Sequence, residues 1–148
     1  MDIERIKNSI RNVADFPKLG IQFKDITTLL EDIDVFEETI DILFQQFKEK
    51  DIEAVVGIES RGFIFGAPLA LKLGCKFSLA RKPGKLPSET ISEKYDLEYG
   101  IDVIEMHKDT INVGDRVLIV DDLLATFFTV DGISNAPGTF ITLKFPLL

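Results

Sequence analysis

The stretch RVLIVDDLLATFFT, residues 116–129, decides the fold class of this 148-residue chain. It contains four consecutive apolar residues, Val117 to Val120, and such a run is typical of a strand buried in a parallel sheet. Two adjacent carboxylates follow, Asp121 and Asp122. Because ligands of open α/β sheets lie beyond the carboxyl ends of the strands, we expect these carboxylates to face a ligand. Carboxylate oxygens are hydrogen-bond acceptors, so they suit sugar hydroxyls or a metal ion.

Apolar runs and helical patterns alternate along the rest of the chain. The expected helices cover residues 3–13, 35–50 and 63–73, and the expected strands cover 54–58, 77–80, 101–106, 117–120 and 139–145. Asp34 is expected to cap the second helix, and Gly74 suits the left-handed turn that ends the third. The alternation indicates an α/β fold with a largely parallel sheet flanked by helices, and we expect one domain over residues 1–148.

The overall composition narrows the possible partners. The chain has 25 Asp and Glu residues against 17 Lys and Arg residues, a formal net charge of −8. A nucleic-acid-binding surface needs a basic face, so we expect no nucleic-acid partner. The single cysteine, Cys75, cannot form an internal disulfide and suits a reducing cytosol. Residues 1–12 lack the apolar core of a signal peptide, and no apolar run is long enough to span a bilayer, so we expect a cytoplasmic protein without a membrane partner.

Three polar segments directly follow expected strands, and parallel strands end at the same edge of a sheet. Residues 59–62 combine a glycine turn, a helix start and Arg61, which is typical of an anion site. Residues 121–129 offer carboxylates and then a threonine-bearing loop. The third segment places cations around a Pro-Gly turn: Arg81, Lys82 and Lys85. Together the segments predict a ligand with phosphate at two ends and hydroxyls between them.

Each segment also has a simpler interpretation. Arg61 could be a surface ion-pair residue, the cations of residues 81–85 could be a solvated charge run, and the two acids could cap a helix. The convergence of all three segments on one sheet edge favours a site. Residues 82–100 hold two prolines, two glycines and many charges, and such long segments are usually lids, binding loops or disordered.

Several motifs together resemble the adenine phosphoribosyltransferases, enzymes of the type I phosphoribosyltransferase fold. Their order and spacing make the resemblance more specific than any single short pattern. The motifs are DFPKLGIQFKDIT at 15–27, ESRGFIFG at 59–66, RKPGKLP at 81–87, YDLEYG at 95–100 and VDDLLAT at 120–126. The resemblance implies that adenine displaces pyrophosphate from 5-phosphoribosyl-1-pyrophosphate (PRPP), which gives AMP and pyrophosphate. It also implies a homodimer and Mg²⁺ carried on PRPP, with no direct metal ligand from the protein.

The resemblance assigns roles to residues around PRPP. Asp121 and Asp122 would hold the ribose hydroxyls and face the cationic ring. Arg61 and its turn would bind pyrophosphate, with added charge from the cations of residues 81–85. The loop for the 5-phosphate would be residues 125–129, with Ala125, Thr126 and Thr129 as its binding residues.

The resemblance also assigns an adenine side, formed by residues 1–33. Phe23 would stack on the base, with the backbone at Gln22 and Lys24 reading its edge and Leu124 pressing on the other face. Residues 82–100 would be a mobile lid that carries Glu98 and Tyr99. The resemblance implies that Glu98 exchanges a proton with the adenine ring. A closed, dry site would raise the pKa of this carboxylate, as such an exchange requires.

The chain departs from the family pattern after Thr126. The family's phosphate loop reads Ala-Thr-Gly-Gly-Thr, whereas Phe127 and Phe128 occupy the glycine positions here. Glycine lets the backbone approach phosphate closely, and phenylalanine removes that freedom. Residues 127–148 therefore form a divergent tail, and the C-terminal part of the fold is expected to be incomplete or altered. Two alternatives to the enzyme stay open: a non-catalytic PRPP- or nucleotide-binding regulator, and an inactive, degenerate copy.

Overall fold

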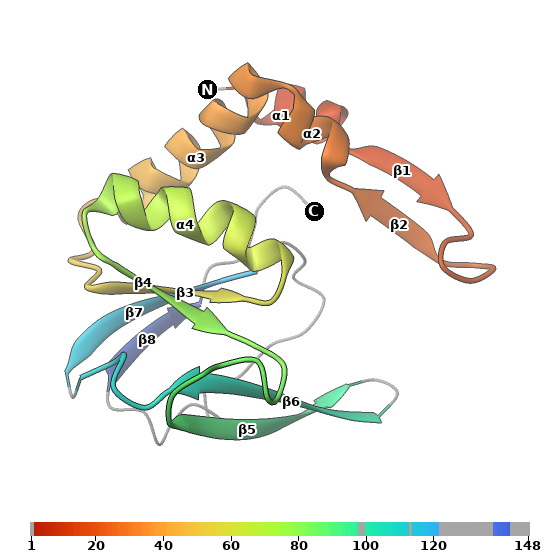
Figure 1. Cartoon of the computed structure of the whole chain (residues 1–148). Coiled ribbons are helices and arrows are strands. Elements are labelled where there is room, and N and C mark those ends of the chain that lie inside the picture. The colour runs from red at the N-terminus through yellow and green to blue at the C-terminus, as the bar shows by residue number, and fades with distance from the viewer. Residues whose placement is uncertain (1, 98–99, 113, 122–137, 143–148) are drawn as a thin grey trace. The chain divides into compact units, whose positions relative to one another are not determined.

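The computed structural model describes residues 2–97, 100–112, 114–121 and 138–142. These residues belong to two compact units, which are described separately: one extends to Gln46, and the other begins at Phe47. The first unit contains α1 (Ile3–Ser9), β1 (Arg11–Ala14), β2 (Gln22–Asp25), α2 (Thr27–Glu31) and α3, which runs from Ile33 to Phe47 at the start of the second unit (Figure 1).

The first helix is shorter than the apolar pattern predicted. It ends at Ser9, and residues 11–14 form β1, which pairs antiparallel with β2. The expected helix over 3–13 is therefore wrong after Ser9. The competing structure is a hairpin whose turn is closed by a hydrogen bond from the Gly20 N–H to an Asp15 carboxylate oxygen, 2.7 Å long. Gly20 has a φ of +87°, a conformation that favours glycine.

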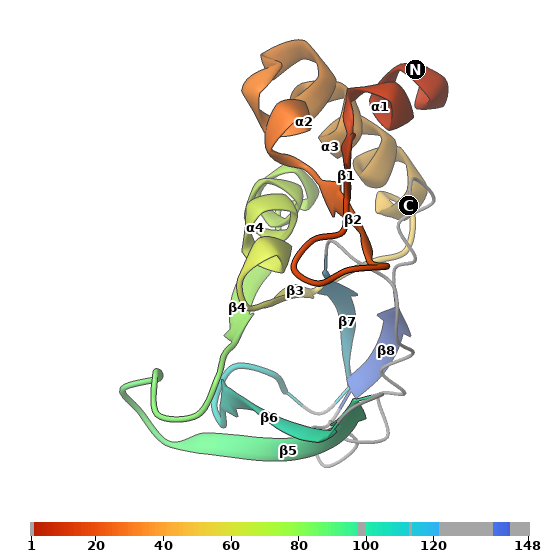
Figure 2. The ribbon, with the colours of Figure 1, turned by 90° about the vertical axis from the view of Figure 1, so that its right-hand side faces the viewer.

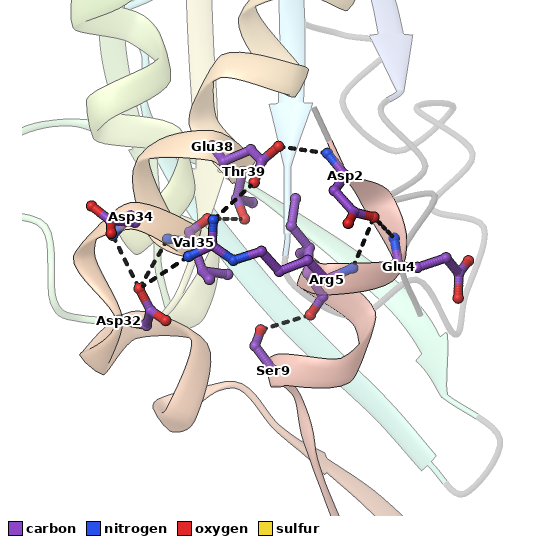
Figure 3. Close-up of polar contacts among 10 residues, drawn as sticks. Asp2, Glu4, Arg5, Ser9, Asp32, Asp34, Val35, Glu38 and Thr39 are labelled. Carbon is purple, nitrogen blue, oxygen red and sulfur yellow. Dashed lines mark hydrogen bonds and ion pairs between the residues drawn. The ribbon is translucent and has the colours of Figure 1, made fainter.

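Acidic residues cap the helices α1 and α3 of this unit, as Figure 3 shows. The Asp2 carboxylate accepts hydrogen bonds from the N–H groups of Glu4 and Arg5, at 3.1 Å each. At the start of α3, the Asp32 carboxylate accepts from Asp34 and Val35, at 3.1 and 3.2 Å. Asp32, and not Asp34, is therefore the capping residue, because its side chain reaches the unpaired N–H groups of the first turn.

The second unit is built on a four-stranded parallel sheet with the order β4-β3-β7-β8, which can be followed from left to right in Figure 2. The helix α4 packs on β3 and β4 (Figure 1). This arrangement confirms the predicted α/β class with a parallel sheet flanked by helices. The unit contains β3 (Ala54–Ile58), α4 (Arg61–Leu73), β4 (Lys76–Ala80), β5 (Thr90–Leu97), β6 (Gly100–His107), β7 (Asp115–Val120) and β8 (Gly138–Thr142).

Residues 82–100 are more regular than the expected long loop. Residues 90–97 form β5, which pairs antiparallel with β6 from Thr90 opposite His107 to Leu97 opposite Gly100. The polar composition hid this strand, because an antiparallel hairpin arm does not have to be apolar on both faces. Ile91 packs against the core of the unit, whereas its neighbour Ser92 is exposed.

Three glycines let α4 lie close to the sheet. A Cβ at Gly57 or Gly66 would lie 2.9 or 2.8 Å from the ring of Phe77, so this ring fits against both glycines. A Cβ at Gly62 would lie 2.4 Å from the Val120 carbonyl oxygen, a backbone atom that cannot turn away. The first turn of α4 therefore reaches the carboxyl end of β7 only because residue 62 has no side chain.

Substitution Gly62→Ala tests this close approach. We expect it to lower the free energy of unfolding by about 2 kcal/mol, since overpacking against a fixed backbone typically costs about 1–3 kcal/mol. Urea unfolding followed by circular dichroism measures the change. Leu71→Ala is the control, because Leu71 lies on the same helix with 85% of its surface exposed and should change the free energy by less than about 0.5 kcal/mol. Equal unfolding midpoints for the parent and Gly62→Ala would contradict the proposed contact.

Candidate active site

The carboxyl ends of three strands meet at one edge of the sheet. The β3–β4 register pairs Ile58 with Ala80, and the β3–β7 register pairs Gly57 with Val120. Residues 59–62, residues 81–85 and Asp121 each continue directly from these ends. The structure therefore brings together the described parts of all three segments, as their position after buried strands predicted.

The turn that carries Arg61 lies beside the end of β7. A Cβ at Gly62 would be 3.2 Å from the Asp121 Cα, so the first turn of α4 and the acidic segment are direct neighbours. Arg61 is the first residue of α4, and Ser60 precedes it without a capping side-chain hydrogen bond. This geometry places Arg61, the first turn of a helix and Asp121 at the same edge of the sheet.

Glu59 is the organising charge of this edge. Its N–H donates to the Ala80 carbonyl at 2.8 Å, which fixes its backbone to the end of β4. One carboxylate oxygen, Oε2, accepts from the Lys82 N–H at 2.8 Å and lies 3.4 Å from Arg81 Nε, and the other oxygen contacts Lys85 Nζ. The Glu59 side chain is only 12% exposed, so it holds three points of the cationic turn from inside.

These contacts change the ionisation of Glu59. The hydrogen bond from Lys85 is the main cause, followed by that from the Lys82 N–H, and together they lower the pKa of Glu59 from 4.5 to about 2. Both contacts stabilise the charged form, and they outweigh the burial that would raise the pKa. Glu59 is therefore a carboxylate throughout the neutral range, paired with the cations that the sequence had placed at this edge.

A second carboxylate also contacts this turn. The Glu105 carboxylate on β6 accepts from the Gly84 N–H at 3.1 Å, and its backbone exchanges two hydrogen bonds with Arg81, at 2.9 and 2.7 Å. Arg81 Nε is buried and makes no hydrogen bond within the part of the chain that the structure describes, although Glu59 lies at ion-pair distance. The cations at residues 81–85 therefore belong to an ordered network and not to a freely solvated run.

The adenine-side residues of the sequence prediction lie on β2 in the first unit. Phe23 contacts Phe16 edge-to-face, with ring centroids 5.1 Å apart and an angle of 69° between the rings. The Lys24 ammonium donates to the Asn12 side chain on β1. Gln22 pairs with Ala14 at the end of the hairpin. The hairpin thus holds Phe23 against Phe16 within a regular strand, and the role of these residues toward adenine stays a prediction.

The roles of Glu59 and Glu105 were not predicted from the sequence. Glu59 stood in a recognised segment, yet only its contacts with residues 81–85 show what it does. Its position one residue after a buried strand was the available signal. The remaining predicted site residues lie outside the described part of the chain and stay predictions: Glu98, Tyr99, Asp122, Leu124, Ala125, Thr126 and Thr129.

Comparisons with known proteins decide the family. Residues 24–134 match the family described as "Phosphoribosyl transferase domain". An adenine phosphoribosyltransferase from Shewanella woodyi is 58% identical over 126 residues, which cover 85% of this chain and 70% of that protein. The chain belongs to the adenine phosphoribosyltransferases. The enzyme of that name from Escherichia coli O157:H7 is 57% identical over 129 residues, 87% of this chain and 70% of that protein.

Solved structures of adenine phosphoribosyltransferases share the fold. The protein from Thermoanaerobacter pseudethanolicus superimposes with a TM-score of 0.88 at 46% sequence identity. The match covers 96% of this chain and 87% of that protein. The Saccharomyces cerevisiae protein, solved with adenine and an imino-altritol bisphosphate, gives a TM-score of 0.83 at 34% sequence identity. That match covers 98% of this chain and 90% of the yeast protein. The likeness confirms the resemblance that the motifs indicated.

The pKa of Glu59 predicts an acid-sensitive contribution to stability. Its folded-state pKa lies below its ordinary value of 4.5, so the contribution is complete above about pH 4.5 and is lost as the pH falls toward 2. The urea midpoints of the parent and of Glu59→Gln at pH 7 and pH 3 measure it, and we expect the parent to lose more. Asp25 and Asp115, whose pKa values are also lowered, act equally in both proteins. A parallel decline of the two midpoints would rule out this contribution.

Proposed function

We propose that this chain transfers the 5-phosphoribosyl group of PRPP to adenine, giving AMP and pyrophosphate in purine salvage. The observation that carries the proposal is the meeting of residues 59–62, residues 81–85 and Asp121 at one sheet edge, in a chain of the adenine phosphoribosyltransferase family. The edge offers cations for a leaving pyrophosphate and a carboxylate for a ribose, the two demands of this reaction.

The proposed chemistry depends on charge that develops as the bond to pyrophosphate breaks. The ribose ring becomes cationic in such a transition state, as in glycoside transfer. Asp121 and Asp122 would hold the ribose hydroxyls and stabilise that positive charge. Arg61, with the cations of residues 81–85, would stabilise the negative charge on pyrophosphate, since preformed opposite charges are among the largest catalytic terms.

The base and the 5-phosphate would occupy the two remaining subsites. Phe23 would stack on adenine, with the backbone at Gln22 and Lys24 at its edge and Leu124 on its other face. Residues 125–129 would bind the 5-phosphate, using Ala125, Thr126 and Thr129. Residues 82–100 would close over the site as a lid, and the lid residues Glu98 and Tyr99 would act at the base.

Mg²⁺ is the proposed cofactor, and it would neutralise part of the pyrophosphate charge. The described residues contain no group of three or more His, Cys, Asp or Glu side chains that could hold a metal ion. Mg²⁺ usually keeps several waters and takes few protein ligands, and it commonly binds through substrate phosphates. Mg²⁺ would therefore be carried on the pyrophosphate and ribose oxygens of PRPP, with no direct ligand from the protein.

The proposed partners are small molecules and a second copy of the chain. Adenine and PRPP would be the substrates, and AMP and pyrophosphate the products, in a cytoplasmic homodimer. In the part of the chain that the structure describes, no helix has the length and apolar character needed to cross a membrane. The net charge of −8 agrees with the absence of a nucleic-acid partner from this proposal.

The activity is tested with labelled adenine, PRPP and Mg²⁺. We expect the parent chain to form AMP above background, and Phe127→Gly combined with Phe128→Gly to raise kcat/KM for PRPP about tenfold, roughly the value of one recovered hydrogen bond to a charged group. Activity in neither protein would refute the proposed function. Activity only in the double glycine variant would identify the natural chain as an inactive copy.

The proposed proton role of Glu98 makes a separate prediction. Glu98→Ala should lower kcat about 100-fold or more, the usual loss for a general acid or base, while the KM for PRPP changes less than about threefold. Steady-state kinetics with each substrate varied in turn measures both values. Glu49→Ala, at an exposed acid outside the proposed lid, is the control. A rise in the KM for PRPP as large as the fall in kcat would contradict the proton role.

A further inference from the structure

We propose that Glu59 is a positioning residue for PRPP binding. Its carboxylate holds Arg81 and Lys85 in place to receive the pyrophosphate group. This inference rests on the proposed function, because PRPP is the anion concerned. Glu59 itself would carry the wrong charge to bind a phosphate, so it would act through the cations that it holds.

Glu59 is bonded to several points of the turn of residues 81–85. Its backbone N–H is bonded to the end of β4, its Oε2 accepts a hydrogen bond from the Lys82 N–H at 2.8 Å, and its Oε1 contacts the Lys85 ammonium. The Lys85 side chain is still 47% exposed, so the contact orients this cation without enclosing it. An oriented but accessible ammonium is suited to an incoming anion.

Arg81 is oriented by the same carboxylate. Its Nε lies 3.4 Å from Glu59 Oε2, and the side chain is 31% exposed. A guanidinium group has five N–H donors in a planar fork, so a carboxylate facing Nε leaves donors at its terminal nitrogens. One terminal nitrogen, Nη1, makes a 3.5 Å contact with the Lys85 carbonyl, which ties the two cationic residues together.

Preorganisation gives this arrangement its expected effect. Ordering a long side chain on binding is costly, and a residue that holds the side chain in place beforehand removes that cost. Two long cationic side chains, Arg81 and Lys85, depend on Glu59. We therefore expect Glu59→Gln to weaken PRPP binding about tenfold while the amide oxygen still accepts from the Lys82 N–H.

A matched control lies at the opposite end of the same strand. Glu53 precedes β3 as Glu59 follows it, and one oxygen of its carboxylate likewise accepts a backbone N–H, that of Arg116, at 2.9 Å. Glu53→Gln removes the same charge and keeps a side-chain oxygen that can accept from the backbone N–H. Residue 53, however, lies at the other end of β3 from residues 81–85. It should bind PRPP within twofold of the parent.

The experiment is calorimetric titration with PRPP and Mg²⁺, in the absence of adenine, so that the readout does not require turnover. It uses the parent, Glu59→Gln, Lys85→Met and the double variant in a cycle, with Glu53→Gln as control. If Glu59 acts through Lys85, Glu59→Gln should weaken binding about tenfold in the parent but less than about threefold in the Lys85→Met background. Glu59→Asp, which keeps the charge on a shorter stem, should bind with intermediate affinity, and it replaces Glu59→Gln if that variant does not fold.

Three results would overturn the inference. Unchanged PRPP affinity in Glu59→Gln would show that the cations need no positioning, and tighter binding would show that Glu59 competes with the ligand. If the loss of PRPP affinity in the double variant equals the product of the two single losses, Glu59 and Lys85 act independently. AMP formation by the parent with any of these results leaves the proposed function standing, whereas a parent that binds no PRPP refutes both.

Discussion

The contact between Gly62 and the Val120 carbonyl is the constraint on which the site depends. A Cβ at residue 62 would be 2.4 Å from that oxygen and 3.2 Å from the Asp121 Cα. A helix that approaches a neighbouring strand this closely brings its first residue, Arg61, beside the carboxylate that ends the strand. The missing side chain of residue 62 thus allows the opposite charges that the reaction needs to lie at the same edge of the sheet.

Placing many charges at one edge creates a second requirement, since cations held near each other repel. Glu59, which follows β3, meets this requirement, because the Lys85 ammonium and the Lys82 N–H stabilise its carboxylate and lower its pKa to about 2. Glu105 on β6 joins the same turn through Gly84 and Arg81. Through Glu105, the hairpin of β5 and β6 is therefore bonded to the turn of residues 81–85, where the proposed lid of residues 82–100 begins.

Local patterns predicted the central part of the fold and failed where tertiary partners decide the structure. The apolar runs at 54–58 and 117–120 could be assigned, because a strand buried on both faces needs little context, and Gly74 ends α4 in the left-handed conformation as expected. Residues 11–14 form a strand because β2 pairs with them. The role of Glu59 depends on residues more than twenty positions away, so composition could not reveal it.

The carboxyl edge of β3, β4 and β7 is the proposed binding site of PRPP. A crystal structure of the chain with PRPP and Mg²⁺ tests it most directly. We expect the pyrophosphate to lie between the turn of Arg61 and the cations of residues 81–85, with the ribose hydroxyls at Asp121. PRPP bound with its pyrophosphate away from both turns, or with its ribose away from Asp121, would contradict it.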